Sequence, residues 1–598
     1  MWQVVVLYTL LLCSPSWTIT LQAMLHRCQQ EQHIETMLLL QHRNQLPCNG
    51  MEQVAAAATW PTLRLNNEAN FYLRSSQSTE MLALLCLTES REVNMEMWQA
   101  LATNLNNMRH VRLLVLQHEA QSLRQLLEEL SAIAQKLRFP HVVLLAATGH
   151  VYRLQPYGSV SWLQLQLDTD TRSPQRVFVK QHNYHLLVAH TLPDQVTSLS
   201  LVYVDKKTQL LRMTGFVARL MQEFTRVHNI SLRWQRPVMA GEELSIILLR
   251  NMTLNGTLNL PITLCGFEEA SALGIYSYPY DIPSWFIMVP CPRQIATADV
   301  FPALFNWRIL SLLFGCYSVF VLLDSMLGSV LTKSKFEWTN LICNERVLSG
   351  IVGQSLLIRA HSTLSSKITQ AQLFVVSLMI GTIVSAHLKT LLTKPPTERK
   401  ISNFPELKDS DLRIFFEESE HYYVSRMSIT SPIHPVRSKI EYLPTNEFYA
   451  QRKSLSVLQG FSVTLTEWNM IKRQQEHFHQ PAFCYYPDLV FHLNLLMSVP
   501  LEANSIYAES LDLFIHKTHS SGLLDYWKAE AVRDLIALGQ ISLKDPYQFE
   551  PFHEFKVEDL LWVWLIIFMG SLVATLAFMG ELFAYHMQRK VVQLEYTE

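Results

Sequence analysis

The sequence predicts a membrane protein in which extracellular α/β domains are interrupted by three transmembrane helices and a re-entrant loop. An apolar leader opens the chain, three apolar segments have the length of a bilayer crossing, and segments with mixed helix and strand periodicity surround them. Charged residues make up only 17% of the chain and hydrophobic residues 49%. Soluble domains contain about 25% charged residues, so this composition indicates a chain that lies partly in lipid.

The chain of 598 residues requires several domains, since single cores stop growing at about 250 to 300 residues. The predicted segments are, in order, a signal peptide (1–18), a small N-terminal α/β domain (19–196), a first α/β lobe (197–300), transmembrane helix 1 (309–331), a re-entrant loop (341–360), transmembrane helix 2 (368–392), a second α/β lobe (396–556), transmembrane helix 3 (560–585) and a cytoplasmic tail (586–598).

The leader is the apolar run VVVLYTLLLC, followed by Ser14-Pro15-Ser16 near the expected cleavage site. No Lys or Arg precedes the run, which leaves a buried N-terminal strand as the alternative. Three glycosylation sequons, at Asn229, Asn251 and Asn255, are usable only in a region that enters the secretory lumen. Their clustering agrees with secretion.

Each long apolar segment supplies the roughly 20 residues that a membrane-crossing helix needs. The first contains one charge, Asp324, and the third none, so a buried core helix is a weak alternative there. The apolar segment between the first two is too short to cross and is broken by Gly350, Gly353 and Gln354. It is predicted to re-enter the membrane as a pore loop, with a helix on the membrane surface as the alternative.

Basic residues support one topology. A cleaved leader places the N-terminal region outside the cell. The predicted cytoplasmic flanks of the membrane segments then contain Lys333, Lys335, Arg359, Lys367, Arg589 and Lys590. Arg308 and Lys394 fall on the other side.

The soluble segments alternate helical and strand patterns. Leucines recur at helical spacing in 122–137, a strand-like run follows at 141–147, an amphipathic helix is predicted at 215–227, helix and strand follow one another in 404–416, and 501–524 has a helical pattern. Two α/β segments on either side of the membrane segments are compatible with a two-lobed domain that closes about a hinge. Closure of such a domain displaces the connections that lead from its lobes to the membrane helices.

Nine cysteines occur singly, without a C-x-x-C pair that would suggest a zinc or redox site. Six lie in predicted extracellular segments, where disulfides form, at positions 28, 48, 86, 265, 291 and 484. Their pairing does not follow from the sequence. Cys484 is the single cysteine of the second lobe, which is therefore expected to be held by packing alone.

Several local motifs occur in a familiar order around the spans. They are a helix at 215–225, Pro261-Ile262-Thr263, Tyr276-Ser277-Tyr278-Pro279-Tyr280 followed by FIMVP, IVSAHLKTLLTKPP at 383–396, and His519-Ser520-Ser521-Gly522-Leu523-Leu524-Asp525-Tyr526-Trp527. Over about residues 197–585 the set resembles the ionotropic glutamate receptors, and more closely the divergent insect chemosensory ionotropic receptors.

The resemblance implies a periplasmic-binding-protein-like bilobed domain that gates a cation pore. It further implies a chemosensory receptor subunit for taste, pheromone or odour, in the plasma membrane of sensory neurons at a dendrite or cilium. Its partners would be a small-molecule ligand, the lipid bilayer and co-receptor subunits in a heterotetramer. The alternative is a subunit that sets ligand specificity but contributes little to the pore.

The same resemblance implies site residues. Pro261 and Thr263 match the ligand-contacting Pro-x-Thr, and Glu467 lies where an acid would meet the ligand's amine. The arginine that clamps the ligand carboxylate falls at Glu268 or Ala270, depending on the direction of counting, so glutamate is not the expected ligand.

In the predicted gate, Ser385 and Ala386 are small enough for helices to cross closely, and Leu388 suits a hydrophobic constriction. His387 is unusual there and is expected to reach toward water. In the pore loop, Gln354 is the expected polar lining group, and Gly350 and Gly353 let the backbone approach the pore axis.

Other classes are disfavoured. The sequence contains no G-x-S-x-G, H-E-x-x-H, Walker or kinase motif, so no enzyme, cofactor or metal is predicted. Three spans without inverted halves argue against a transporter, and a net charge of −2 without a basic stripe argues against nucleic acid.

Overall fold

The computed structural model describes residues 15–31, 33–44, 59–117, 122–166, 175–196, 199–266, 275–293, 307–331, 344–354, 363–393, 397–545 and 561–595. The chain forms two compact units, Met1–Pro290 with Ser402–Pro546, and Cys291–Ile401 with Tyr547–Glu598. All predicted membrane segments fall in the second unit. Most of the predicted signal peptide lies outside the described residues, and its last part, from Pro15, begins helix α2 (Pro15–Glu31).

The first unit opens with a seven-stranded sheet. Its strands, in spatial order, are β2 (Thr62–Asn66), β1 (Thr36–Gln41), β3 (Met81–Leu87), β4 (Arg112–Gln117), β5 (Val142–Leu145), β6 (Val151–Gln155) and β7 (Ser161–Leu165). The strands from β2 to β5 pair in parallel, whereas β6 and β7 are antiparallel. The apolar run MLALLCL in β3 is typical of a parallel strand covered on both faces.

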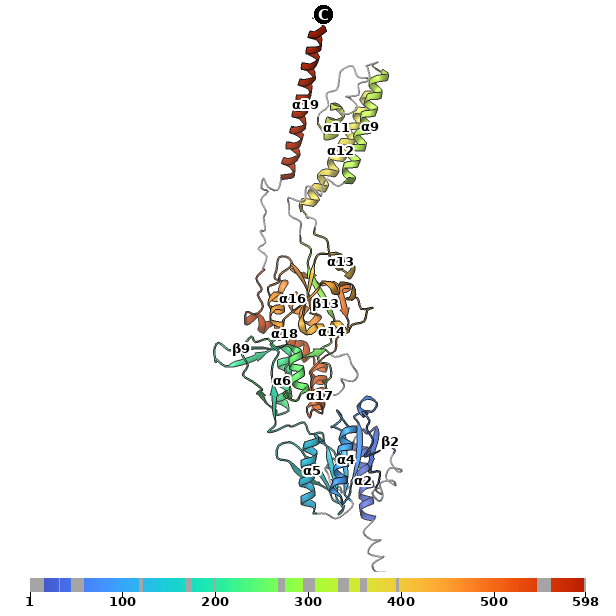
Figure 1. The fold of residues 1–598 in the computed structure, drawn as a ribbon, viewed down its shortest axis with the longest axis vertical. Helices are drawn as coiled ribbons and strands as arrows, with labels where there is room; N and C mark the ends of the chain where they lie inside the picture. The colour runs from blue at the N-terminus through green and yellow to red at the C-terminus, as the bar shows by residue number, and fades with distance from the viewer. Residues whose placement is uncertain are drawn as a thin grey trace, which may run out of the picture. The chain divides into compact units, whose positions relative to one another are not determined.

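Helices cover both faces of this sheet (Figure 1). Leu38 and Leu40 of β1 belong to a buried cluster with α4 (Arg91–Asn104) and α5 (Leu123–Leu137). Leu39 points to the opposite face, where it packs with residues of α2, because successive side chains of a strand alternate between faces. The helix and strand predicted at 122–137 and 141–147 are confirmed as α5 and β5.

A second group of elements surrounds the amphipathic helix α6. We call it the α6 cluster: α6 (Phe216–Val227), α17 (Ala508–Ser520), α18 (Leu523–Ala537), β8 (Val188–Thr191) and β11 (Ser231–Trp234). Buried side chains of these elements form one hydrophobic core. The amphipathic helix predicted at 215–227 is confirmed. The predicted run 501–524 is helical only from Ala508, because Leu501 pairs with Ile275 through its backbone N–H instead.

A second sheet has six strands. They are β15 (Ile440–Leu443), β14 (Arg413–Glu417), β16 (Gln459–Thr464), β13 (Trp285–Pro290) and β17 (Phe483–Cys484), with β18 (Val490–His492) also paired to β13. The accompanying helices are α13 (Phe404–Asp409), α14 (His421–Arg426), α15 (Thr445–Lys453) and α16 (Leu465–Gln475). The predicted helix and strand within 404–416 are confirmed as α13 and β14.

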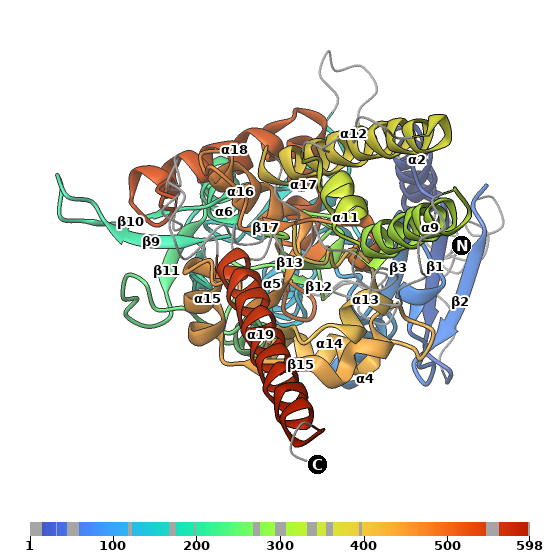
Figure 2. The same cartoon turned by 90° about the horizontal axis from the view of Figure 1, so that it is seen from above.

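The remaining elements of this unit are short. They are α7 (Ile246–Leu254), the pair β12 (Cys265–Gly266) and β19 (Met497–Ser498), the hairpin β9 (Leu201–Val204) and β10 (Leu211–Thr214), and the 3-10 turns η1 (Leu73–Ser75), η3 (Glu418–Glu420), η4 (His434–Lys439) and η5 (Pro487–Leu489). The hairpin β9–β10 projects from its surroundings (Figures 1 and 2).

Segments from either side of the first two predicted membrane helices interleave. β13 precedes these two helices and pairs with β16, which lies between the second and the third. In the same way α18, also between the second and the third, packs against α6. β8 pairs with β11 although the predicted domain boundary at 196 separates the two strands. Such pairings join distant parts of the chain, so local periodicity gives no sign of them.

The second unit contains α9 (Trp307–Leu331), α11 (Glu345–Val352), α12 (Leu364–Thr393) and α19 (Leu561–Glu595). Within the described residues, the spans Leu310–Leu327, Leu364–Thr390 and Val563–Met587 are long and apolar enough to cross a membrane. They lie in the three helices that the sequence predicted. The chain thus combines α/β sheet domains with three helices suited to a membrane protein.

Short α11 packs against α9 and α12, where Phe320, Val321, Val347 and Leu373 form a small core. Asn344 caps α11 by accepting from the backbone N–H groups of Arg346 and Val347. These contacts place the predicted loop segment beside two of the long helices.

Candidate functional site

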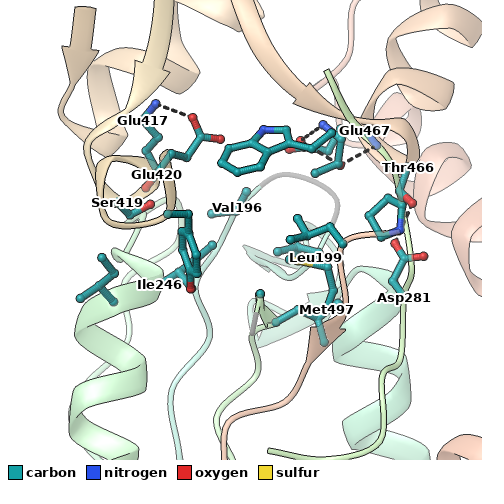
Figure 3. Close-up of a pocket in the computed structure, with 18 of the residues that line it drawn as sticks. Val196, Leu199, Ile246, Asp281, Glu417, Ser419, Glu420, Thr466, Glu467 and Met497 are labelled. Atoms are coloured by element: carbon teal, nitrogen blue, oxygen red, sulfur yellow. Dashed lines mark hydrogen bonds between the residues drawn. The ribbon is translucent and has the colours of Figure 1, made fainter. Parts of the chain in front are cut away.

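A cavity of about 90 Å³ lies within the first unit. Its walls come from α6, from the second sheet with its helices, and from α7, β12, β19 and the segment between β8 and β9. Apolar side chains such as Val196, Leu199, Phe216, Trp285 and Met497 line it. One water needs roughly 10–15 Å³ of such volume, so several waters or one small organic molecule fit. Acidic side chains stand on two sides of it, Glu417 and Glu420 on one and Glu467 and Asp281 on the other (Figure 3).

Glu467 stands at the first turn of α16. The Thr464 hydroxyl accepts from the Glu467 backbone N–H at 3.4 Å, and Glu467 Oε2 accepts from the Thr464 backbone N–H at 3.3 Å. This reciprocal capping box satisfies two backbone donors that the helix itself leaves free. It also holds the Glu467 carboxylate at the cavity wall.

The charge of Glu467 is already neutralised. Its Oε1 accepts from Arg452 Nη2 at 2.7 Å, and the two side chains are only 15% and 7% exposed. Burial by itself would raise the pKa of Glu467, but the attraction of the Arg452 guanidinium outweighs it and lowers that pKa. Glu467 is therefore an ionised partner of Arg452.

Asp281 is neutralised in the same way on the same side. Its Oδ1 accepts from Lys528 Nζ at 2.8 Å, and its Oδ2 accepts from the Thr466 hydroxyl at 2.6 Å. Lys528 belongs to α18, so this contact joins the α6 cluster to the wall of the cavity. Both oxygens of Asp281 have a donor.

Glu417 and Glu420, at the end of β14 and in the turn after it, lack such cations. Glu417 accepts from the hydroxyls of Thr445 at 2.9 Å and Tyr449 at 3.4 Å. Glu420 accepts from the Glu417 backbone N–H at 3.0 Å and from the Ser462 hydroxyl. Among the described residues, no Lys or Arg forms a salt bridge with either carboxyl.

Without a salt bridge among the described residues, Glu417 and Glu420 have raised pKa values. Burial raises the pKa of Glu417. Burial, and then repulsion by Glu417, raise the pKa of Glu420 to about 8. Near neutral pH this side of the cavity therefore holds a proton on Glu420 and readily accepts a cation in its place. The arrangement suits a ligand that brings an ammonium group and an apolar body.

The predicted ligand residues have different positions. Glu467 lines the cavity, and its predicted contact with a ligand stays a prediction. Pro261 and Thr263 are buried and do not line it, although the next residue, Leu264, does. Glu268 lies outside the described residues.

Sequence reasoning missed Asp281, Thr466, Glu417 and Glu420. A signal for the last two is present, because an acidic run directly follows the apolar strand pattern RIFF. Thr464 and Glu467 also have the spacing of a capping box, which would have placed Glu467 at a helix start.

The predicted pore residues lie around α11. Gly350 is buried within this helix, Gly353 ends it with a left-handed φ of 84°, and Gln354 follows with an exposed side chain. Asp324, the charge in the first span, accepts from Asn344 Nδ2 at 2.9 Å. The predicted gate residues Ser385, Ala386, His387 and Leu388 lie on α12. A pore role for these residues stays a prediction.

The three predicted glycosylation sites have exposed asparagines. Asn229 lies in the turn after α6, Asn251 on α7 and Asn255 at the end of α7. Their exposure is compatible with modification.

The expectation that packing alone holds the second lobe is wrong. Cys484 of β17 is disulfide-bonded, as are Cys86 and Cys291. Cys484 lies opposite Val289 on β13, a strand from before the membrane helices. Because Cys484 is the single cysteine of the second lobe, its disulfide partner comes from elsewhere in the chain. Cys28, Cys265 and Cys316 are free thiols.

No family model matches this chain, and neither does any curated protein.

Proposed function

We propose that this protein is a ligand-gated cation channel subunit that serves as a chemosensory receptor in the plasma membrane of sensory neurons, and that its ligand is a small amine rather than glutamate. The supporting observation is the uneven charge of the cavity. The carboxylates Glu467 and Asp281 are neutralised by cations, whereas Glu417 and Glu420 are not. An ammonium group placed between the latter two would supply the missing charge.

A carboxylate ligand has no equivalent partner. Among the described residues that line the cavity there is no Arg or Lys. The nearby cations Arg452 and Lys528 are bound to Glu467 and Asp281. Releasing either one would leave a buried carboxylate without its counter-charge, which costs several kcal/mol.

The covalent path supports coupling between the cavity and the membrane helices. Trp285, at the start of β13, lines the cavity, and Pro290, at its end, is the last residue of the first unit before the chain enters the second. The chain re-enters the first unit at Ser402, just before α13 and β14. Closure of the two binding lobes would pull on these connections.

In the proposed receptor, co-receptor subunits complete a heterotetramer around a cation pore. Gln354 would line that pore and Leu388 would form its gate. Substitution of Gln354 by Glu in the expressed complex, followed by measurement of the ion permeability ratio, tests this part by itself. An unchanged ratio favours the alternative, a subunit for ligand specificity that contributes little to the pore.

Current recording tests the ligand class. Cells expressing the chain with candidate co-receptors are exposed to matched amines, amino acids and carboxylates. Loss of a contact to a charged group costs about 1.5–3 kcal/mol, so Glu420→Gln and Glu417→Gln should raise the half-maximal amine concentration by roughly 10-fold or more. Glu418→Gln is the matched control, because this neighbouring carboxylate is exposed and lies outside the cavity wall.

The pH dependence has a defined sign. Glu420 ionises as pH rises through about 8, so amine potency should rise over that range and the rise should vanish in Glu420→Gln. Activation by glutamate with no response to amines would contradict the proposal. So would an amine response that both variants leave unchanged.

A further inference from the structure

A second polar cluster lies away from the cavity, where the N-terminal sheet meets α17. His110 precedes β4 and His141 directly precedes β5, while Glu509 occupies the first turn of α17. One side-chain donor atom from each lies within 4.8 Å of the others. Residues from three distant parts of the chain thus converge on one point.

The distances centre on one oxygen. Glu509 Oε2 lies 3.6 Å from His110 Nδ1 and 3.6 Å from His141 Nε2. This oxygen is buried and has no hydrogen-bond partner. A buried carboxylate oxygen without a donor is costly, so its position calls for a cation or a proton between it and the rings.

The orientation of His110 follows from its second nitrogen. Its Nε2 lies 3.1 Å from the carbonyl oxygen of Ser505, which only accepts hydrogen bonds. Nε2 must therefore hold the hydrogen, and in a neutral ring Nδ1 has the free electron pair. This electron pair faces Glu509 Oε2. A backbone carbonyl that fixes a ring in this way is the usual support of a metal-binding histidine.

The other oxygen of Glu509 is already occupied. Lys180 Nζ donates to Glu509 Oε1 and lies 3.4 Å from Glu80 Oε1, and Glu80 is held in turn by Arg112 at 2.6 Å. These contacts fix the Glu509 carboxylate and leave Oε2 as the single free ligand atom of that group. His182, whose buried Nδ1 has no hydrogen-bond partner, adds a further imidazole that interacts with Glu509.

We propose that His110 Nδ1, His141 Nε2 and Glu509 Oε2 bind a divalent transition-metal ion of the zinc class. Zinc takes nitrogen and oxygen ligands at about 2.0–2.2 Å in tetrahedral geometry, which separates the ligand atoms by about 3.4 Å. The two separations from Glu509 Oε2, both 3.6 Å, are close to that value, and the two ring nitrogens lie within 4.8 Å of each other. Water completes the fourth position.

The ion would fasten α17 to the N-terminal sheet. The same junction is joined by the backbone N–H of Asn107, which donates to Asn504 Oδ1 at 2.7 Å, and by Arg138, which lies 3.1 Å from Glu502 Oε2. A metal that takes ligands from both sides adds a link that a chelator can remove. The proposed ion acts at this junction, and the proposal does not depend on the proposed receptor function.

Metal content measured on the purified full-length protein tests the proposal. The protein in detergent is stripped with a chelator, equilibrated with Zn²⁺ over a range of free concentrations, and analysed by mass spectrometry for bound metal. We expect one zinc per chain. His141→Gln and Glu509→Gln should weaken zinc binding by about 100-fold or more, given that even supporting residues change metal affinity 10- to 100-fold.

His33→Gln is the matched control. His33 Nε2 lies 3.2 Å from Glu35 Oε1, but the pair is exposed and has no third ligand among the residues that the structure describes. Its substitution should leave the zinc content unchanged. Loading with Co²⁺ gives a second readout, since a tetrahedral nitrogen and oxygen site produces visible absorption that His141→Gln should abolish.

Misfolding is controlled by comparing only monodisperse protein and by adding Glu509→Asp, which keeps the charge but withdraws the oxygen by one methylene. Wild-type protein that retains no zinc at micromolar free metal would overturn the proposal, leaving only a buried contact between the two imidazoles and the Glu509 carboxylate. Equal zinc content in wild type and Glu509→Gln would overturn it as well.

Discussion

The two sides of the cavity contain the same chemical groups in opposite states. On one side Glu467 and Asp281 each have a cation as partner, and the attraction of Arg452 lowers the pKa of Glu467 against the effect of burial. On the other side Glu417 and Glu420 have hydroxyl and backbone donors, and their pKa values are raised. The partner, not the residue type, decides which carboxylate remains available to a ligand.

The largest expected effect comes from breaking the paired side. Arg452→Met leaves Glu467 buried without its counter-charge, which should destabilise α15 and α16 by about 3–5 kcal/mol. Amide hydrogen exchange over these helices measures the local opening free energy. The double variant Arg452→Met with Glu467→Met should recover much of the loss.

Arg413→Met serves as the control for that prediction. Arg413 lies 3.7 Å from Glu441, but its side chain is 76% exposed, and exposed pairs of this kind contribute little. Equal protection in wild type and Arg452→Met would show that the paired side is not held by its ion pair.

The unpaired side should respond to pH. Between the pKa of an unfolded glutamate and about 8, the folded protein keeps a proton on Glu420 that the unfolded chain releases. Stability that depends on Glu420 therefore falls as pH rises through this window. The thermal unfolding temperature of Glu420→Gln should fall less steeply from pH 5 to 8 than that of wild type. The unfolding temperature of Glu418→Gln should follow that of wild type. Parallel slopes in all three would contradict the raised pKa.

A smaller effect is expected for Lys528→Met. The Lys528 side chain is 25% exposed, and Thr466 still donates to Asp281 after the change. The loss should be about 1–2 kcal/mol, less than for Arg452, because the Asp281 carboxylate keeps hydrogen bonds from the Thr466 hydroxyl and from the Ile282 backbone N–H. Hydrogen exchange in α18 measures it, and a loss as large as that of Arg452→Met would remove the distinction between these pairs.

The smallest effect is expected for Glu418→Gln. The Glu418 side chain is exposed, and surface substitutions of this kind usually change stability by less than about 0.5 kcal/mol. A change in the pH dependence of thermal stability as large as that of the Glu420 variant would mean that charge density alone, not enclosure, governs this side.

Local patterns predicted local structure well. Leucine periodicity located α5, the amphipathic pattern located α6, and three apolar runs located α9, α12 and α19. What the sequence did not indicate is which strands pair. β13 finds its partner β16 far along the chain, and β8 pairs across a predicted boundary. These contacts depend on tertiary packing, which leaves no periodic trace.

The cavity shows the same division. Glu467 was found because a motif order suggested where to look, and its capping box follows from spacing. Its partner Arg452 lies on another helix, and Lys528 comes from a third segment to reach Asp281. The charge of a site depends on such pairs, so a sequence that shows acids does not show which are free.

The interleaving of segments has a consequence for synthesis. β13 emerges from the ribosome roughly 170 residues before β16, and the helices α9 and α12 lie between the two strands in the sequence. At about 5–20 residues per second, its apolar side chains Phe286, Ile287 and Met288 wait on the order of ten seconds or more for their partner strand. Over that interval the nascent chain exposes an unpaired hydrophobic strand, and chaperones would be needed to keep it from aggregating.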